Sequence, residues 1–125
     1  MLDHIGFPVT DFARSKAFYE RVLAPLGMRI VMAVNLDDED GYAGFGIERP
    51  FFWIGTGKPL TGRLHVAFAA KSRAEVQAFY EAAIAAGATD NGPPGLRPHY
   101  HENYYAAFVL DPDGHNLEAV NHLPE

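Results

Sequence analysis

Two histidines and one glutamate have the residue types and surroundings of a metal-binding site. His4 and His65 each lie in a short apolar segment, and Glu118 is a carboxylate within the apolar stretch that ends at Val120. A lone buried carboxylate is costly unless it is paired or bound to a metal. Two imidazoles and one carboxylate on a rigid sheet can form a facial triad, which leaves coordination positions open for water or substrate. These three residues are therefore candidate metal ligands.

Each of these residues also has an ordinary structural interpretation. A single histidine in a strand is often half-buried, with its ring bonded to a backbone carbonyl. A glutamate on an edge strand can point to solvent, where it hinders pairing with other strands. The small neighbours of the histidines favour the metal site instead. Gly6 near His4 and Ala67 near His65 are typical of strands that line a concave ligand site.

The two histidines occupy equivalent positions in an internal repeat. The tetrapeptide Ala-Phe-Tyr-Glu at 17–20 recurs at 78–81, 61 residues later, and the same offset relates His4 to His65. A period of about 60 gives two copies, which is too few for a solenoid and suits a pseudo-twofold pair. Because a twofold axis brings equivalent residues together, we expect His4 and His65 to face each other across one site.

Each half of the chain has the pattern of one strand, one helix and about three further strands. Alternating apolar residues predict strands, and apolar residues at i, i+3, i+4 and i+7 predict amphipathic helices. The expected fold class is therefore α+β and largely antiparallel, with the helices on one face of the sheet. The expected strands span 2–9, 28–36, 42–47 and 51–54 in the first half, with an acidic turn at 37–41, and 63–70, 104–110 and 115–120 in the second.

Both helices have recognisable start signals. Thr10-Asp11 begins the first, and Ser72 with Glu75 forms a capping box, in which the serine oxygen accepts a backbone N–H and the glutamate returns the bond. The Gly/Pro-rich segment 91–98 is expected to be a loop. The residues expected to be buried on the two helices are Ser15, Phe18, Tyr19, Val22 and Leu23, then Val76, Phe79, Tyr80, Ala83 and Ile84.

Composition is that of an ordinary globular protein. Of the 125 residues, 48% are hydrophobic and 21% charged, so we expect one domain over 1–125, with module one at about 1–60 and module two at about 61–125. No apolar run approaches the roughly 18–20 residues of a membrane span. The net charge of −6 disfavours nucleic acids and anionic membranes as partners. The absence of cysteine and of a signal-peptide pattern fits a cytoplasmic location.

A second group of reactive side chains lies in segment 97–105. His99 and His101, two residues apart in an extended segment, share a side and are suited to acid–base work or to extra metal ligation. The alternative is a polar surface loop with aromatic anchors. Since loops on a rigid scaffold often carry function, we expect His101 and Tyr104 to be catalytic.

Substrate contacts are expected from Arg97 and Tyr105 in the same segment and from Trp53. With Phe51 and Phe52, Trp53 can wall an apolar pocket, although a place in the strand core is the commoner explanation for such residues. The remaining histidines, His99, His115 and His122, are expected to be surface residues.

The strings that surround these residues resemble those of a known superfamily. They are Asp3-His4-Ile5-Gly6, the Phe18-Tyr19 helix, Leu64-His65-Val66-Ala67-Phe68, and the most specific one, which runs from Phe108-Val109-Leu110-Asp111-Pro112-Asp113-Gly114 to Glu118. Over nearly its whole length the chain resembles the vicinal oxygen chelate superfamily, which includes glyoxalase I, bleomycin-resistance proteins, fosfomycin-resistance enzymes and extradiol dioxygenases.

The resemblance implies a fold and a metal site. It implies two βαβββ modules in a pseudo-twofold arrangement, with curved mixed sheets around a central metal-binding cleft. It also implies that His4, His65 and Glu118 bind one divalent ion, for which Zn, Fe, Mn, Ni and Co are all suitable. The family's usual chemistry is Lewis-acid catalysis on a substrate that binds the metal through adjacent oxygens. A single pair of modules often completes its cleft with a second chain, so the resemblance further implies a homodimer.

Departures from individual families leave the reaction unnamed. Glyoxalase I has a fourth, carboxylate ligand where Trp53 or a close neighbour falls here, and Glu48 is the one nearby acid. The position of the acid–base tyrosine of extradiol dioxygenases is Phe108. Fosfomycin-resistance enzymes have a basic segment after the glutamate, which this chain lacks between Glu118 and Glu125.

Two functions remain compatible with the sequence. The first is a metalloenzyme of the lyase or isomerase type that acts on a small oxygen-rich metabolite or xenobiotic. The second is a non-catalytic protein that binds and sequesters a planar or hydrophobic compound, as bleomycin-resistance proteins do. An intact triad of ligands favours the enzyme.

Overall fold

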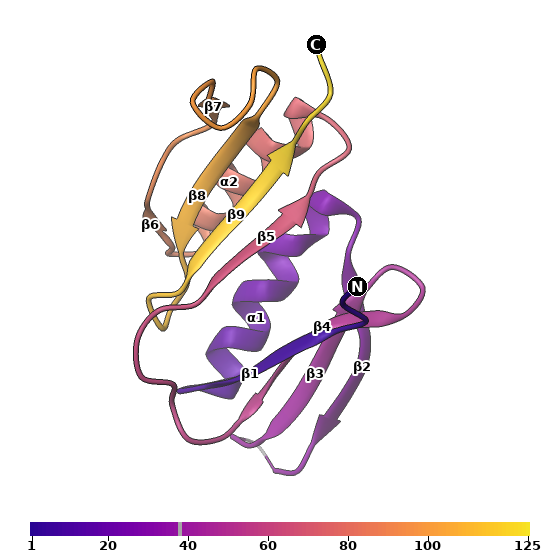
Figure 1. The fold of residues 1–125 in the computed structure, drawn as a ribbon. Coiled ribbons are helices and arrows are strands. Elements are labelled where there is room, and N and C mark those ends of the chain that lie inside the picture. The colour runs from indigo at the N-terminus through magenta and orange to yellow at the C-terminus, as the bar shows by residue number, and fades with distance from the viewer. Residues whose placement is uncertain (38) are drawn as a thin grey trace. The chain divides into compact units, whose positions relative to one another are not determined.

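The computed structural model describes residues 1–37 and 39–125. Asp38, which belongs to the acidic turn expected at 37–41, lies outside them. The chain divides into two compact units, Met1–Gly62 and Arg63–Glu125, and the two units repeat one order of elements (Figure 1). In the described part of the chain, no helix is long and apolar enough to cross a membrane.

The first unit is a four-stranded mixed sheet with a helix packed on one face (Figure 1). The strand order is β1-β4-β3-β2, in which β1 runs parallel to β4 and the other neighbours are antiparallel. Its elements are β1 (Ile5–Val9), α1 (Phe12–Leu23), the 3-10 turn η1 (Ala24–Leu26), β2 (Arg29–Asn35), β3 (Gly41–Gly46) and β4 (Pro50–Thr56).

The second unit repeats this plan with a broken edge strand. The order is β5-β9-β8-β6, with β7 also paired to β8, and β5 runs parallel to β9. The predicted α+β class, with mixed sheets and few helices, is therefore confirmed. The elements are β5 (His65–Ala69), α2 (Arg73–Ala85), β6 (Thr89–Asp90), β7 (Gly95–Leu96), β8 (Tyr105–Leu110) and β9 (Asn116–Asn121).

The expectation that segment 91–98 is only a loop is wrong. Within it, Gly95 pairs with Ala106 and Leu96 with Tyr105, so this part of the segment is a strand at the edge of the sheet. Gly92, with φ 142°, lies between β6 and β7, where its backbone leaves the extended conformation. The fourth strand position is therefore occupied by two short pieces, and the Gly/Pro content marks the break between them.

The helices begin at the predicted residues, with one difference in the capping box. The side chains of Asp11 and Ser72 accept the backbone N–H groups of Arg14 (3.0 Å) and Glu75 (3.1 Å). The Glu75 carboxylate, however, accepts the N–H of Lys71 at 2.7 Å and not that of the serine, so the returned bond reaches one residue further back.

The two cores differ in their side chains. In the first unit Tyr19 packs against Phe52 and Phe45, with ring centroids 4.9 and 6.2 Å away. In the second, Val76, Phe79 and Ala83 are the buried residues of α2. The expectation that Ile84 is buried is wrong, since the residue is 40% exposed. Each helical residue turns by about 100°, which carries Ile84 past the edge of the buried stripe.

His115 is buried, against the expectation that it lies on the surface. It is 3% exposed, and its ring Nδ1 accepts the backbone N–H of Leu64 at 3.0 Å. The turn before it is held by Asp111, whose carboxylate accepts the N–H groups of Asp113 and His115, both at 2.9 Å. His115 therefore joins the β8–β9 hairpin to the residue that precedes β5.

We predict that His115→Ala lowers the free energy of unfolding by about 1–3 kcal/mol, because it leaves the Leu64 N–H without its side-chain acceptor in a part-buried position. Urea unfolding of the two proteins measures the difference. His99→Ala is the matched control: His99 is exposed, and its removal should change the stability by less than about 0.5 kcal/mol. Equal losses in the two variants would contradict this role of His115.

Candidate functional site

Glu118 is a buried carboxylate in the middle of a sheet. Its strand β9 lies between β5 and β8, and Glu118 stands opposite Ala67 on one side and Phe108 on the other. Its flanking residues Leu117 and Ala119 are in the core, so by alternation Glu118 points to the other face of the sheet. It is 1% exposed. The alternative of a solvent-exposed glutamate on an edge strand is therefore wrong.

His65 and Glu118 are in direct contact. His65 Nε2 lies 2.9 Å from Glu118 Oε1, and the ring donates this bond when the carboxylate is ionised. The side chain of His65 is 54% exposed, whereas the side chain of Glu118 is 2% exposed. Ala67 and Ala69, on the same strand as His65, are also exposed. Two of the three predicted ligands are thus in contact, with His65 facing solvent and Glu118 buried beneath His65.

Tyr104, just before β8, contacts the same carboxylate. Its hydroxyl donates a hydrogen bond to Glu118 Oε2. Burial, followed by the hydrogen bond to and the negative charge of Glu118, raises the pKa of Tyr104 to about 12. The phenol is therefore neutral and a donor at physiological pH, and both oxygens of Glu118 have a partner.

His101 lies in the loop that positions Tyr104, but no hydrogen bond joins it to Glu118 in the described structure. Its carbonyl accepts the N–H of Tyr104 at 3.1 Å, and its Nδ1 accepts that of Asn103 at 3.3 Å. The ring of His122 lies between the two predicted catalytic residues, 5.8 Å from the His101 ring and 5.0 Å from that of Tyr104. His101 itself is exposed.

The structure gives Arg97 and Tyr105 other partners. The guanidinium of Arg97 donates to the carbonyls of Gly95 (2.8 Å) and Pro93 (2.7 Å), so it holds its own loop. Tyr105 is turned toward α2, where its hydroxyl accepts the amide of Gln77 at 2.9 Å. Successive strand residues point to opposite faces, and the structure does not bring Tyr105 to Glu118.

His4, in the first unit, is oriented by a chain of charged partners. Its Nδ1 lies 2.7 Å from an oxygen of Asp3, whose second oxygen lies 2.8 Å from Arg49. The hydrogen bond with His4, and then the bond and charge of Arg49, lower the pKa of Asp3. With its Nδ1–H donated to the carboxylate, the ring presents Nε2 as the nitrogen that can bind a metal. The His4 side chain is 60% exposed.

Trp53 occupies the position in the first unit that Glu118 occupies in the second. The 61-residue offset relates Gly6 to Ala67, and these two residues pair with Trp53 and Glu118 respectively. The indole lies over Gly44, where an added Cβ would come within 2.9 Å of it. Trp53 is therefore outside the core that Phe52 fills, on the opposite face of the sheet.

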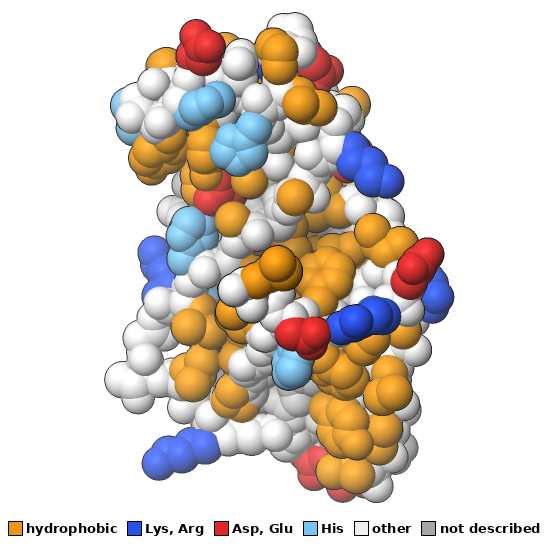
Figure 2. Space-filling model, turned by 45° about the vertical axis from the view of Figure 1, so that its right-hand side comes forward, with side chains coloured by type: hydrophobic (Ala, Val, Ile, Leu, Met, Phe, Trp, Pro, Cys, Tyr) orange, Lys and Arg blue, Asp and Glu red, His pale blue; other side chains and the backbone are white. Residues whose placement is uncertain are grey.

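An open hollow of about 430 Å³ is lined by Trp53, Tyr42 and the strand residues around them. The Tyr42 and Trp53 rings are 6.2 Å apart. Figure 2 shows hydrophobic side chains gathered on parts of the surface that it displays. The face is suited to flat or apolar groups.

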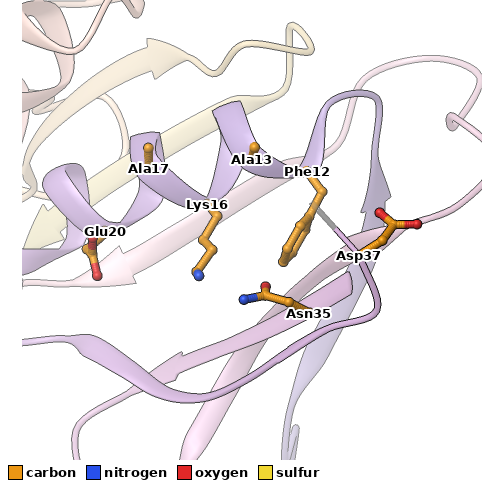
Figure 3. Close-up of a pocket in the computed structure, with 7 residues that line it drawn as sticks. All are labelled: Phe12, Ala13, Lys16, Ala17, Glu20, Asn35 and Asp37. Atoms are coloured by element: carbon orange, nitrogen blue, oxygen red, sulfur yellow. The ribbon is translucent and has the colours of Figure 1, made fainter. Parts of the chain in front are cut away.

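A second hollow, of about 560 Å³, lies beside α1 and contains none of the predicted site residues. Figure 3 shows Lys16 and Glu20 on the helix and Asn35 and Asp37 on the other side. The pKa of Asp37 is lowered by backbone N–H groups of Glu39 and Asp40. Opposite charges four residues apart, such as Lys16 and Glu20, are neighbours on an exposed helix face, so the sequence did not indicate a site here.

The available donors suit a borderline divalent metal. In the second unit, His65 with its proton on Nδ1 would offer Nε2 beside Glu118 Oε1, one nitrogen and one oxygen. In the first unit, His4 would offer Nε2 as a nitrogen donor. Imidazole with carboxylate is a set that Zn, Fe, Mn, Ni and Co all accept. Within either unit taken alone, the described residues include no group of three or more His, Cys, Asp or Glu side chains that could hold an ion.

Comparison with known proteins establishes the family. Residues 1–119 match the model of the Glyoxalase/Bleomycin resistance protein/Dioxygenase superfamily, so the chain belongs to this superfamily, and the resemblance seen in its sequence is confirmed. A glyoxalase/bleomycin resistance protein from Albidiferax ferrireducens T118 is 32% identical, with 99% of each chain covered and a TM-score of 0.80. A search of curated proteins gave no match.

Two further structures share the fold at lower identity. One is a variant of the genomically encoded fosfomycin resistance protein FosX from Listeria monocytogenes, complexed with Mn(II) and 1S,2S-dihydroxypropylphosphonic acid. It is 22% identical, with 96% of this chain and 88% of that chain covered and a TM-score of 0.70. The other is TioX from Micromonospora sp. ML1, which is 21% identical, with 98% and 99% covered and a TM-score of 0.73.

Proposed function

We propose that this protein is a metal-dependent enzyme of the lyase or isomerase type. The single observation that carries the proposal is the contact of His65 with Glu118, a carboxylate buried in a central strand. A buried carboxylate needs a compensating partner, and a half-exposed imidazole beside it makes an accessible pair of donors. His4, His65 and Glu118 are the proposed ligands of one Zn, Fe, Mn, Ni or Co ion.

In this proposal the residues around the metal have different roles. Asp3 fixes the tautomer and orientation of His4, as outer-shell carboxylates do for metal-binding histidines. Glu118 and its buried surroundings keep water from the inner side of the donor pair. The metal would supply Lewis-acid stabilisation of negative charge on a substrate that offers adjacent oxygens. The phosphonic-acid diol bound with Mn(II) by FosX is a compound of that oxygen-rich kind.

Proton transfer is assigned to His101 in this proposal. The Tyr104 hydroxyl already donates to Glu118, whereas the imidazole of His101 is exposed and can change its charge near neutral pH. Trp53 is the proposed apolar substrate contact. The other two predicted contacts, Arg97 and Tyr105, have their polar groups bonded to the loop backbone and to Gln77.

A specific observation also favours the second candidate function, which is sequestration of a planar compound. The face that carries Trp53 and Tyr42 is aromatic and open, with the two rings 6.2 Å apart, and exposed aromatic rings suit stacking on a flat group. In that case the aromatic face would do the binding, and any metal would be incidental.

Metal content separates the two functions. We predict that protein purified without added metal contains about one divalent ion per chain by elemental analysis. His65→Ala and Glu118→Ala should lose it, with at least the roughly 10–100-fold fall in affinity that even an outer-shell change produces. His99→Ala, with its exposed ring, should retain it. Full occupancy in Glu118→Ala would contradict the proposed site.

A pair of variants tests the mechanism once a substrate is known. We predict that Glu118→Ala loses metal and activity together, whereas His101→Ala keeps the metal and loses rate by about 10²–10⁴-fold, the range for a general acid or base. Metal content and kcat are measured on the same samples. Full activity of metal-free Glu118→Ala would mean that the pocket handles the compound without metal.

We also propose a homodimer. Met32 pairs with Gly44 beside Trp53 and is 51% exposed, and Tyr42 on the same face is 43% exposed. Large apolar patches are uncommon on monomers, and twofold pairs are the commonest oligomers. Light scattering at micromolar concentration should give twice the 13.8 kDa mass of the chain. Met32→Glu should weaken the dimer and Leu96→Glu should not. A monomer mass for the unmodified protein would refute it.

A further inference from the structure

The two oxygens of Glu118 have different partners. Oε1 is bonded to the half-exposed ring of His65 at 2.9 Å, and Oε2 accepts the hydroxyl of Tyr104. An ionised carboxylate has two equivalent oxygens that can bind one metal singly or together. In this site the two oxygens are not equivalent, because Oε1 faces Nε2 of His65, another proposed ligand, and Oε2 faces the hydroxyl of Tyr104.

Tyr104 is itself fixed from several directions. Its N–H donates to His101 O at 3.1 Å, and its carbonyl accepts the N–H of Arg97 at 2.7 Å. The ring packs edge-on against Tyr100 and His122, with centroids 5.1 and 5.0 Å away. A ring held on its backbone and on two sides leaves the hydroxyl little freedom, so it holds Oε2 in one place.

We propose that Tyr104 is a positioning residue that keeps Glu118 a one-oxygen metal ligand. Its hydroxyl occupies Oε2, which leaves Oε1 alone to bind beside His65 Nε2. Without the phenol, the carboxylate is free to turn and to bind through both oxygens, which fills a coordination position that substrate oxygens would otherwise take. This inference rests on the proposed metal site and assigns Tyr104 a role other than proton transfer.

Tyr104→Phe tests the proposal, because it removes one oxygen atom and keeps the ring between Tyr100 and His122. The probe is Co(II), titrated into metal-free protein and followed by its visible absorption. We expect Tyr104→Phe to bind Co(II) with a changed visible spectrum, since the spectrum reports the number of coordinated atoms and the freed carboxylate adds one oxygen to them. Tyr100→Phe, whose residue is 62% exposed, is the matched control and should behave as the wild type does.

A second measurement uses the unmodified protein alone, so the proposal does not depend on the folding of the variant. Infrared spectra of the Zn(II)-loaded protein with ¹³C-labelled glutamate separate one-oxygen from two-oxygen coordination by the splitting of the carboxylate stretches. A two-oxygen signature in the wild type overturns the proposal, as does a Tyr104→Phe protein with the wild-type spectrum. A wild type that binds neither ion overturns the proposed function itself, and this inference with it.

Discussion

The second unit depends on one buried carboxylate, in a position where a charged group is unfavourable. Glu118 is 1% exposed in the central strand β9, and the effective penalty for burying an isolated carboxylate is several kcal/mol. His65 and Tyr104 offset that penalty with one hydrogen bond to each oxygen. Tyr104, in the loop before β8, and His65, the first residue of β5, are thereby bonded to the same carboxylate. The positions of these candidate site residues therefore depend on Glu118.

Strand pairing explains how the contact arises from residues 53 positions apart. In each unit the first strand lies parallel to the last one, and the long connection that parallel strands need consists of the helix and the strands between them. The arrangement sets Ala67 opposite Glu118 and places His65 two residues along the same face. The same rule sets Gly6 opposite Trp53. The repeat is therefore symmetric in its backbone and asymmetric in its chemistry, with a carboxylate in one unit and an indole at the equivalent position in the other.

Much of the fold was predictable because it depends on local signals. Period-two strands, the caps Asp11 and Ser72, and the repeat itself are all readable from neighbouring residues. The errors fall where distant partners decide. His115 follows a turn and has the pattern of a surface residue, yet it is buried because Leu64, 51 positions away, donates to its ring. β7 was missed because its strand character comes from pairing with β8 and not from its own Gly/Pro-rich sequence.

The candidate site was partly predictable for the same reason. Glu118 was identifiable because a carboxylate interrupts an apolar strand, and His65 because the repeat marks it. Which of two adjacent tyrosines reaches Glu118 depends on how β8 pairs with β9: Phe108 stands opposite Glu118, so alternation directs Tyr104 to the carboxylate and Tyr105 toward α2. A slip of one residue in this pairing would exchange the two rings. The chemistry of the site is thus set by strand register as much as by residue type, and register is a property of the folded sheet.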